Sequence, residues 1–301
     1  MKSPINNESD VVLEKEIAVD RIVNLYKKKY LIDVRKYFLN LEKVGLFKCI
    51  KTGYRFYTPF NIAGDSDFYI HFQQYDWYYM PWKWEHEIVL AFIKPENKIL
   101  EVGCGEGAFL KKIHELTDVE CVGLELNESS VLNSQKIKIE NSTIEEYSEN
   151  NKQQFELVCS FQVLEHISHV NSFIKAQVDC LKRGGLLIIS VPNNNSFTKY
   201  DKKHALNMPP HHIGLWDEES LKSLEKYFEL KFKKIFYEPL QPYHFSWYTI
   251  LILQKYMGSF ASKILHRSIM YMGLQSLIDK YLTKKASQIK GHSIMIIFEK
   301  I

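Results

Sequence analysis

Three glycines, spaced two residues apart, follow a short apolar segment that contains one carboxylate. The segment 98–102 carries Glu101, and the glycines are Gly103, Gly105 and Gly107. Glycines let a ligand approach the backbone where any Cβ would clash. A phosphate bound at such a turn relies on the positive field of a helix N-terminus, which a nearby carboxylate opposes. We therefore expect a nucleoside-like ligand that lacks phosphate and carries a cation.

The residues on either side of the glycines predict a strand before the turn and a helix after it. Apolar side chains at helical spacing run from Phe109 to Leu116, so the segment predicts the first unit of a nucleotide-binding α/β fold. The spacing Gly-x-Gly-x-Gly and the second acid, Glu106, argue against a dinucleotide-dependent oxidoreductase. The stretch 98–110 resembles motif I of the class I S-adenosylmethionine-dependent methyltransferases. The resemblance implies that Glu101 holds the amino-acid end of the cofactor.

A second carboxylate stands where a nucleoside site needs one. Residues 119–126 predict a strand that ends near Glu125, roughly 20 residues after the first glycine, the offset at which an acid binds ribose hydroxyls. A carboxylate can accept hydrogen bonds from both hydroxyls. On the resemblance, the residues expected to contact S-adenosylmethionine, or its product S-adenosylhomocysteine, are Glu101, Gly103, Cys104, Gly105, Gly107, Glu125, Leu126, Thr143, Ile144, Phe161 and Gln162.

Two later segments match the order of elements in the same family. Residues 155–167 resemble motif IV, the fourth strand and its following loop, and residues 181–193 resemble the turn and fifth strand. The apolar run 186–189 is typical of a strand that is buried on both faces. The resemblance covers roughly residues 88–236 together with a last strand at 291–301.

The predicted fold class is α/β, a Rossmann-like sheet of seven mostly parallel strands with helices on both faces. We expect four regions: an N-terminal helical and aromatic-rich extension (1–87), a cofactor-binding core (88–240), a helical cap insertion (241–290) and a last core strand (291–301). The extension is predicted to be helical because residues 11–46 mix charged and apolar residues at helical spacing. The last strand is expected to be antiparallel, between strands five and six.

Histidines are the candidates for acid–base chemistry. Methyl transfer is an in-line displacement in which the reacting atoms begin about 3–3.5 Å apart. A sugar hydroxyl must also lose a proton, and a histidine suits that role. His166 follows the fourth strand, and His211 and His212 lie in a loop at the predicted ligand-binding edge. The sequence does not separate the three, and we predict O-methylation with one of them as the base.

The acceptor is predicted to be a small molecule or a saccharide. Tyr78, Tyr79 and Trp84 are candidate acceptor-binding residues, because Tyr and Trp combine stacking area with a hydrogen-bonding edge. Residues 164–166 resemble ubiquinone-pathway O-methyltransferases, some of which carry a further acid three residues before the glutamate and bind a metal. Gln162 occupies that position here, so no metal is expected. The sharper expectation is a saccharide of a surface-polysaccharide pathway, that is, glycan modification.

Composition bounds the remaining partners. The formal net charge of +3 on 301 residues is too small to imply nucleic-acid binding. Five cysteines without paired spacing and a polar, mixed-charge N-terminus predict a reduced, cytoplasmic protein. The basic parts of residues 241–290 could touch an anionic membrane, although packing or self-association is the preferred interpretation. A non-catalytic module that binds S-adenosylmethionine is the alternative function, and the oligomeric state stays open.

Overall fold

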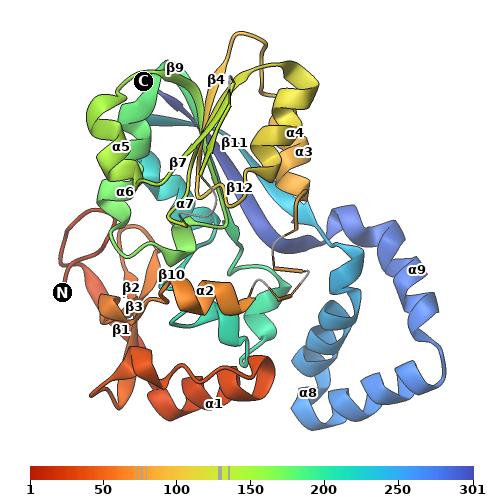
Figure 1. Ribbon diagram of the computed structural model, residues 1–301. Coiled ribbons are helices and arrows are strands. Elements are labelled where there is room, and N and C mark those ends of the chain that lie inside the picture. Colours follow the sequence, from red (N-terminus) through yellow and green to blue (C-terminus); the bar gives the residue numbers. More distant parts are fainter. Residues whose placement is uncertain (73, 76, 79, 128–130, 135) are drawn as a thin grey trace.

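A twisted sheet forms the centre of the computed structural model, which describes residues 1–72, 74–75, 77–78, 80–127, 131–134 and 136–301 (Figure 1). Within these residues the sheet has eight strands in the order β11-β12-β9-β8-β4-β5-β7-β6. Their bounds are β4 Lys98–Val102, β5 Glu120–Leu124, β6 Leu132–Asn133, β7 Ile137–Glu140, β8 Phe155–Phe161, β9 Leu181–Pro192, β11 Leu230–Pro239 and β12 Lys290–Lys300. The predicted strands of the core are confirmed, with the two-residue β6 added at one edge.

Strand direction follows the expectation from the sequence. β4, β5, β7, β8 and β9 pair in parallel, whereas β12 pairs antiparallel with both β9 and β11. The last strand therefore lies between strands five and six of the core, as predicted. Because the parallel strands all end at the same edge, the turns after β4, β5 and β8 gather there, facing the N-terminal part of the chain (Figure 1).

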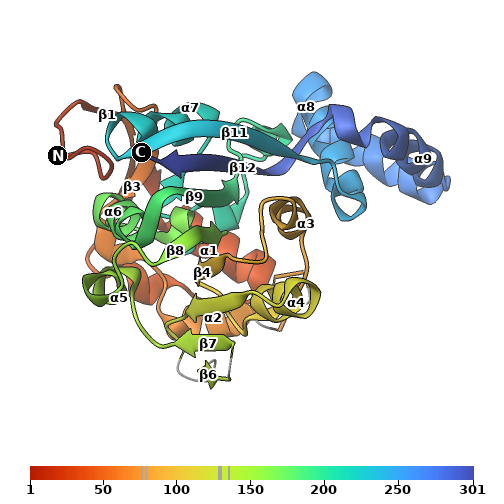
Figure 2. The same cartoon turned by 90° about the horizontal axis from the view of Figure 1, so that it is seen from above.

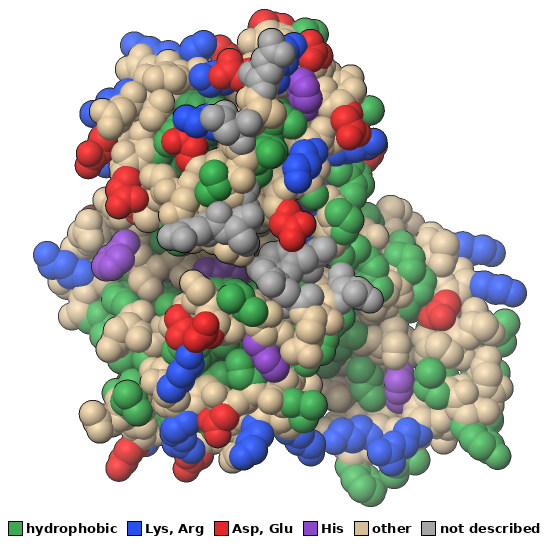
Figure 3. All heavy atoms as spheres, viewed as in Figure 1, with side chains coloured by type: hydrophobic (Ala, Val, Ile, Leu, Met, Phe, Trp, Pro, Cys, Tyr) green, Lys and Arg blue, Asp and Glu red, His purple; other side chains and the backbone are tan. Residues whose placement is uncertain are grey.

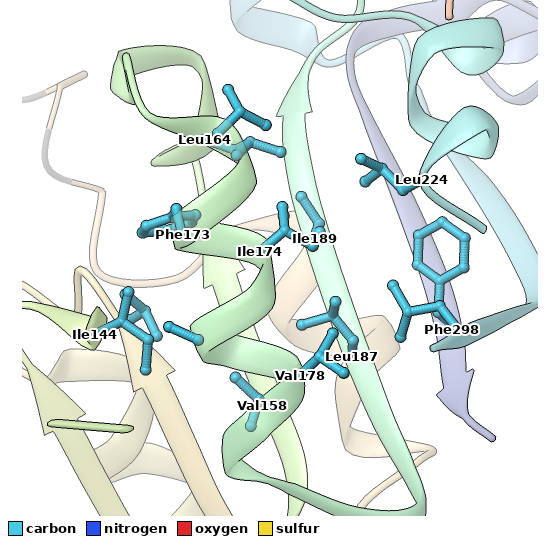
Figure 4. Packing of buried hydrophobic residues seen from close by; sticks show 14 of the residues in the cluster. Ile144, Val158, Leu164, Phe173, Ile174, Val178, Leu187, Ile189, Leu224 and Phe298 are labelled. Carbon is cyan, nitrogen blue, oxygen red and sulfur yellow. The ribbon is translucent and has the colours of Figure 1, made fainter. Parts of the chain in front are cut away.

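Helices cover both faces of this sheet (Figure 2). The elements are α3 Trp84–Leu90, α4 Ala108–Thr117, α5 Ile144–Asn150, α6 Val170–Cys180 and α7 Glu218–Lys222. On one face α6 packs Phe173, Ile174 and Val178 against Leu187 and Ile189 of β9 (Figure 4). On the other face, α3 and α4 bury Val89, Phe109 and Ile113. The two apolar layers hold the strands, and hence the turns at their ends, in place.

The N-terminal region corrects the helical prediction for residues 11–46. It contains β1 Val11–Ala18, α1 Val19–Tyr30, β2 Lys43–Cys49 and β3 Arg55–Thr58. These strands form an antiparallel sheet in the order β1-β2-β3-β10, in which β10 (Gly214–Leu215) comes from the core. Within residues 11–46, the α-helix predicted from the spacing of apolar residues forms only at α1. The charged residues of β1 face solvent along a strand and not along a helix, since its burial pattern leaves Ile17 as its buried residue.

The aromatic segment that follows β2 contributes several fully buried rings to the core. Tyr54, Phe56, Phe68 and Phe72 are fully buried, the last two on α2 Ser66–Phe72. This packing joins the N-terminal sheet and α2 to the loop between β9 and α7.

The insertion before the last strand is helical, as predicted, but it is not a cap over most of its length. α8 Phe245–Tyr271 and α9 Gln275–Lys285 form a hairpin that stands beside the sheet rather than over the strand ends (Figures 1 and 2). Its root packs Leu251 and Leu282 against Phe197, and Gly258 interrupts α8 with a φ of +78°. Among the described residues, no helix combines the length and apolarity that crossing a membrane requires.

Candidate active site

The glycine turn after β4 is built for close approach. Gly103 has φ +75°, and a Cβ there would lie 2.5 Å from Val163 Cγ2; Gly107 has φ +70°, and a Cβ would lie 2.5 Å from Ile139 Cδ1. Gly105 also has a positive φ, +54°, but nothing lies within 4 Å of its Cβ position. The outer glycines are therefore favoured by both their positive φ and close packing, whereas the middle one leaves open space over the backbone, as a ligand needs.

The carboxylate of Glu125 lies against this turn. Its Oε2 accepts a hydrogen bond from the Gly105 backbone N–H at 2.9 Å. Its Oε1 accepts from the N–H groups of Leu126 at 2.9 Å and Asn127 at 3.2 Å. Three backbone donors thus orient the carboxylate at the end of β5, beside the predicted ligand position.

Glu101 is a buried carboxylate, and one of its oxygens makes no hydrogen bond to a described residue. It is 5 % exposed, and its Oε2 has no hydrogen-bond partner in the described part of the chain. Burial raises the pKa of Glu101 well above its ordinary value, with Lys83 opposing and Glu125 adding to the shift. An orphaned buried carboxylate is costly, and a cationic ligand such as the expected cofactor would compensate it. The residues present therefore fit that group.

Glu85 on α3 is a second buried carboxylate with an oxygen that is unpartnered in the described part of the chain. No sequence motif identifies it. It is 1 % exposed, its Oε2 has no partner among the described residues, and burial raises its pKa. Its Oε1 lies 3.4 Å from Nε2 of Gln162, which also approaches the hydroxyls of Ser190 at 3.2 Å and Ser293 at 3.4 Å. The one available sequence signal is a glutamate on the apolar helix that precedes motif I.

The other predicted cofactor contacts are less direct. Thr143 caps α5 and exchanges hydrogen bonds with Glu146, and Ile144 is 1 % exposed within the core. Because both side chains are engaged in these contacts, a ligand could reach only the backbone of Thr143 and Ile144. The side chain of Leu126 is exposed. Phe161 packs in the core, with its ring centroid 4.9 Å from that of His86. Cys104 is nearly buried beside the turn, and its thiol approaches the Gly105 carbonyl.

The three candidate histidines come together in one cluster. His166 belongs to the 3-10 turn Leu164–His166 after β8, whereas His211 and His212 lie in the loop before β10. One potential ligand atom from each lies within 4.8 Å of the others. The backbone N–H of Ile213 donates to the Glu165 carbonyl at 2.9 Å, which joins the two loops.

Hydrogen bonds distinguish the three rings. His166 Nδ1 lies 2.6 Å from the His211 carbonyl oxygen, so it carries the proton and leaves Nε2 with a lone pair. His212 Nδ1 lies 3.2 Å from Asn207 Oδ1. His211 uses both nitrogens, Nδ1 with the Leu206 carbonyl at 3.0 Å and Nε2 with the Tyr78 hydroxyl at 2.6 Å. His166 and His212 are therefore better placed to accept a proton than His211.

Glu165 lies between the two available nitrogens. Its Oε1 is 3.9 Å from His166 Nε2 and 4.0 Å from His212 Nε2, and its Oε2 has no partner among the described residues. Burial raises the pKa of Glu165 to about 8. Burial lowers the pKa of His166 to about 4 and that of His212 well below its usual value, so both imidazoles are neutral at pH 7.

The same cluster could also hold a metal ion. Three imidazoles converge, and a carbonyl oxygen fixes the tautomer of His166, as is common for metal-binding histidines. Gln162, by contrast, donates to its neighbours and offers no charge. The expectation that no metal is needed therefore stays a prediction.

Of the predicted acceptor-binding residues, one lies at the histidines. Tyr78 bonds His211, Trp84 keeps a buried indole N–H without a partner in the described part of the chain, and Tyr79 lies outside the described residues. Tyr69 also contacts the cluster, with its hydroxyl 3.2 Å from His166 Nδ1. Nothing in the local sequence singles out Tyr69 from the other aromatic residues around it.

Comparisons with known proteins find sequence similarity over the part of the chain that contains the glycine turn. Residues 77–231 match the family described as a methyltransferase domain. The chain is 31 % identical over 154 residues to a mitochondrial ubiquinone biosynthesis O-methyltransferase of Dictyostelium discoideum, covering 44 % of this chain and 48 % of that protein. It is 28 % identical over 126 residues to a ubiquinone biosynthesis O-methyltransferase of Pseudomonas syringae pv. tomato, covering 38 % and 54 %. The chain thus spans about half the length of the curated relatives it matches.

A solved SAM-dependent methyltransferase from Archaeoglobus fulgidus is also similar. It is 19 % identical, with a TM-score of 0.48, over 78 % of this chain and 100 % of that one.

Proposed function

This chain belongs to the methyltransferase-domain family, and on that premise we propose that it transfers the methyl group of S-adenosylmethionine to an acceptor hydroxyl. The cofactor supplies an electrophilic methyl group and leaves as S-adenosylhomocysteine. The single observation that carries the proposal is the orphaned oxygen of Glu101 beside a glycine turn to which Glu125 is bonded. Such a site suits a ligand that carries both a cation and ribose hydroxyls.

Each carboxylate has a separate task in this proposal. Glu125 accepts from the ribose hydroxyls, exchanging one or more of its backbone donors for them. Glu101 lies deeper and faces the positively charged amino-acid end. Gly105 leaves the backbone open where the ligand passes. These residues bind and orient the methyl group, and orientation is the larger part of the catalytic demand in a displacement at carbon.

The acceptor hydroxyl loses its proton to the histidine cluster. His166 is the preferred base, because its Nε2 holds the lone pair and its side chain is 18 % exposed, against 5 % for His212. Its low pKa keeps the ring neutral and ready to accept a proton, but weakens the driving force for the transfer. Ionised Glu165, 3.9 Å away, would stabilise the imidazolium that forms.

The acceptor is proposed to be a small hydroxyl compound, with a saccharide as the specific prediction. Support comes from Tyr69 and Tyr78, whose rings pack beside the histidines with centroid distances of 5.5 Å to His166 and 5.5 Å to His211. Aromatic faces of this kind suit sugars and phenols alike. The names of the two curated relatives support O-methylation. A phenol is the competing acceptor, because it would stack on the same aromatic faces.

The alternative, a non-catalytic S-adenosylmethionine-binding module, calls for an acceptor side without suitably placed polar groups. Here the turn that carries His166 adjoins the glycine turn. Val163, which packs against Gly103, accepts a backbone hydrogen bond from His166, three residues later. This proximity favours catalysis over a purely binding role.

Release of S-adenosylhomocysteine would be measured with nucleotide-activated sugars and with catechols as acceptors. The comparison uses wild type, His166→Asn, and the exposed His169→Asn as the matched control. Turnover with either acceptor class that is lost in His166→Asn and kept in His169→Asn supports O-methylation with this base. Turnover that survives in His166→Asn refutes the base, and cofactor binding without turnover on any hydroxyl acceptor refutes the O-methylation proposal.

A further inference from the structure

The hairpin of α8 and α9, here called the arm (residues 245–285), exposes apolar side chains that the proposed reaction does not use. Phe260 is 81 % exposed and Tyr271 is 94 % exposed. The large apolar side chains that are exposed on the arm are Tyr256, Met257, Phe260, Ile264, Leu265, Met270, Tyr271, Met272, Leu274, Leu277 and Tyr281. So dense an apolar surface on a soluble domain usually marks an interaction site.

Three of these side chains form an apolar stripe on the part of α8 that follows Gly258. Phe260, Ile264 and Tyr271 are four and seven residues apart on α8, so they share one face of the helix. The buried residues of the same stretch, Ser262 and Ile269, lie on the opposite face. The helix is therefore already packed on one side, and the exposed stripe is a second, separate surface.

The arm is also strongly basic. Asp279 is its single acid, against six cations: Lys255, Lys263, Arg267, Lys280, Lys284 and Lys285. None of the six forms an ion pair within the part of the chain that the structure describes. Arg267 falls on the same helix face as the apolar stripe, and Lys263 borders it. In Figure 3 basic and apolar side chains adjoin along the lower edge of the arm, at the lower right.

Charge decides which partner this surface fits. Two arms packed face to face would bring like charges together, which opposes self-association. An anionic lipid surface is complementary, since aromatic and aliphatic side chains enter the headgroup boundary while Lys and Arg reach the phosphates. We propose that the arm binds the surface of membranes that contain anionic lipids, lying in the interface without crossing the bilayer.

This attachment is independent of the methyl-transfer proposal. It uses neither the glycine turn nor the histidine cluster, and it needs no cofactor. The arm is nevertheless joined to the core near the loop after β9, because the Trp247 ring lies 5.0 Å from that of His204. A membrane-bound arm would hold the catalytic domain beside the lipid surface.

Vesicle co-sedimentation tests the proposal with the full chain. The probes are phosphatidylcholine vesicles alone and the same vesicles with 30 % phosphatidylglycerol. An apolar variant replaces Phe260, Ile264 and Tyr271 by Ser, and a charge variant replaces Lys263, Arg267 and Lys284 by Gln. The control for the apolar variant replaces Leu31, Leu39 and Ile50, which are exposed outside the arm, by Ser. The control for the charge variant replaces Lys27, Lys28 and Lys29 of α1 by Gln.

Wild type and both controls are expected to bind the anionic vesicles and to bind neutral vesicles at least tenfold more weakly. The charge variant should lose about fivefold in partitioning for each cation removed, and the apolar variant should lose binding altogether. Equal binding to both vesicle types, or unchanged binding in the two arm variants, overturns the proposal. So does an absence of vesicle binding by a wild-type dimer that the apolar variant converts to a monomer.

Discussion

The backbone N–H of Gly105 donates a hydrogen bond of 2.9 Å to Oε2 of Glu125, joining the turn after β4 to the end of β5. Adjacent parallel strands place these two elements side by side. The bond means that a ligand entering over Gly105 meets an oriented carboxylate. It also means that Glu125 has an interaction to exchange when a ribose arrives, so that its contribution to binding is the difference between two hydrogen-bonded states.

Replacing the buried carboxylate at the strand tip should separate binding from stability. Glu101→Gln is expected to weaken cofactor binding at least tenfold, because it removes the charge that faces the cation. The pKa of Glu101 is raised by burial, so the wild type loses stability as pH rises above the unfolded pKa, whereas the variant does not. At pH 8 the variant should melt about 2–4 °C higher, the shift that corresponds to about 1 kcal/mol in a large domain.

The gain in melting temperature should be largely lost near pH 4, where the carboxyl is protonated in the folded wild type and mostly protonated in the unfolded chain. Differential scanning calorimetry at the two pH values checks this. A variant that melts lower than wild type at pH 8 would show that Glu101 is stabilising even without a ligand.

The pH dependence of turnover is set by Glu165 in this account. Burial raises the pKa of Glu165 to about 8, so its carboxylate forms as pH rises through that value and can then stabilise protonated His166. We expect kcat/KM of the wild type to rise with pH through about 8 and to level off above about pH 9. Glu165→Gln should have lower activity and should lose this rise. An identical pH profile in the variant would place the controlling group elsewhere.

The two available imidazoles are expected to differ. His166→Asn should lower kcat by about 10²–10⁴-fold, the usual contribution of a general base, and should leave the dissociation constant for S-adenosylmethionine unchanged. His212→Asn should have a smaller effect, because His212 is less exposed. Steady-state kinetics together with binding measurements distinguish the two. A greater loss in His212→Asn than in His166→Asn would reassign the base.

Metal removal tests the competing use of the cluster. Because Gln162 donates its side-chain N–H to neighbours and provides no charged ligand, dialysis against a strong chelator should leave turnover unchanged. Metal analysis of the purified protein should find well under one equivalent of any divalent ion. Loss of activity that is restored by one equivalent of zinc or manganese would show instead that the three histidines bind a functional metal.

Local sequence patterns correctly predict those parts of the fold that depend on neighbouring residues. The glycine turn, Glu125 and the last strand each depend on local spacing, since a strand, a turn and a helix follow one another directly in the chain. The helical prediction for residues 11–18 is wrong because a solvent-facing strand with a single buried residue, Ile17, has no distinct apolar alternation. Its identity as a strand depends on pairing with β2, which local sequence does not reveal.

The histidine site depended on contacts between distant segments. His166 and His211 meet because β10 pairs with β3 of the N-terminal sheet and because Ile213 bonds to the Glu165 backbone. No local sequence motif indicates either contact. Likewise, the choice between the three rings rests on which ring nitrogens are hydrogen-bonded and on how exposed each side chain is, and both depend on the folded loops.

The central claim is that the glycine turn and Glu125 bind S-adenosylmethionine. Calorimetric titration of wild type and Glu125→Ala with S-adenosylmethionine and S-adenosylhomocysteine tests it directly, with the exposed Glu115→Ala as the matched control. Micromolar binding by wild type and control, weakened about 30-fold or more in Glu125→Ala, is the predicted result, in keeping with a loss of about 2 kcal/mol for hydrogen bonds to a charged group. No binding by wild type, or equal binding in Glu125→Ala, would contradict the account.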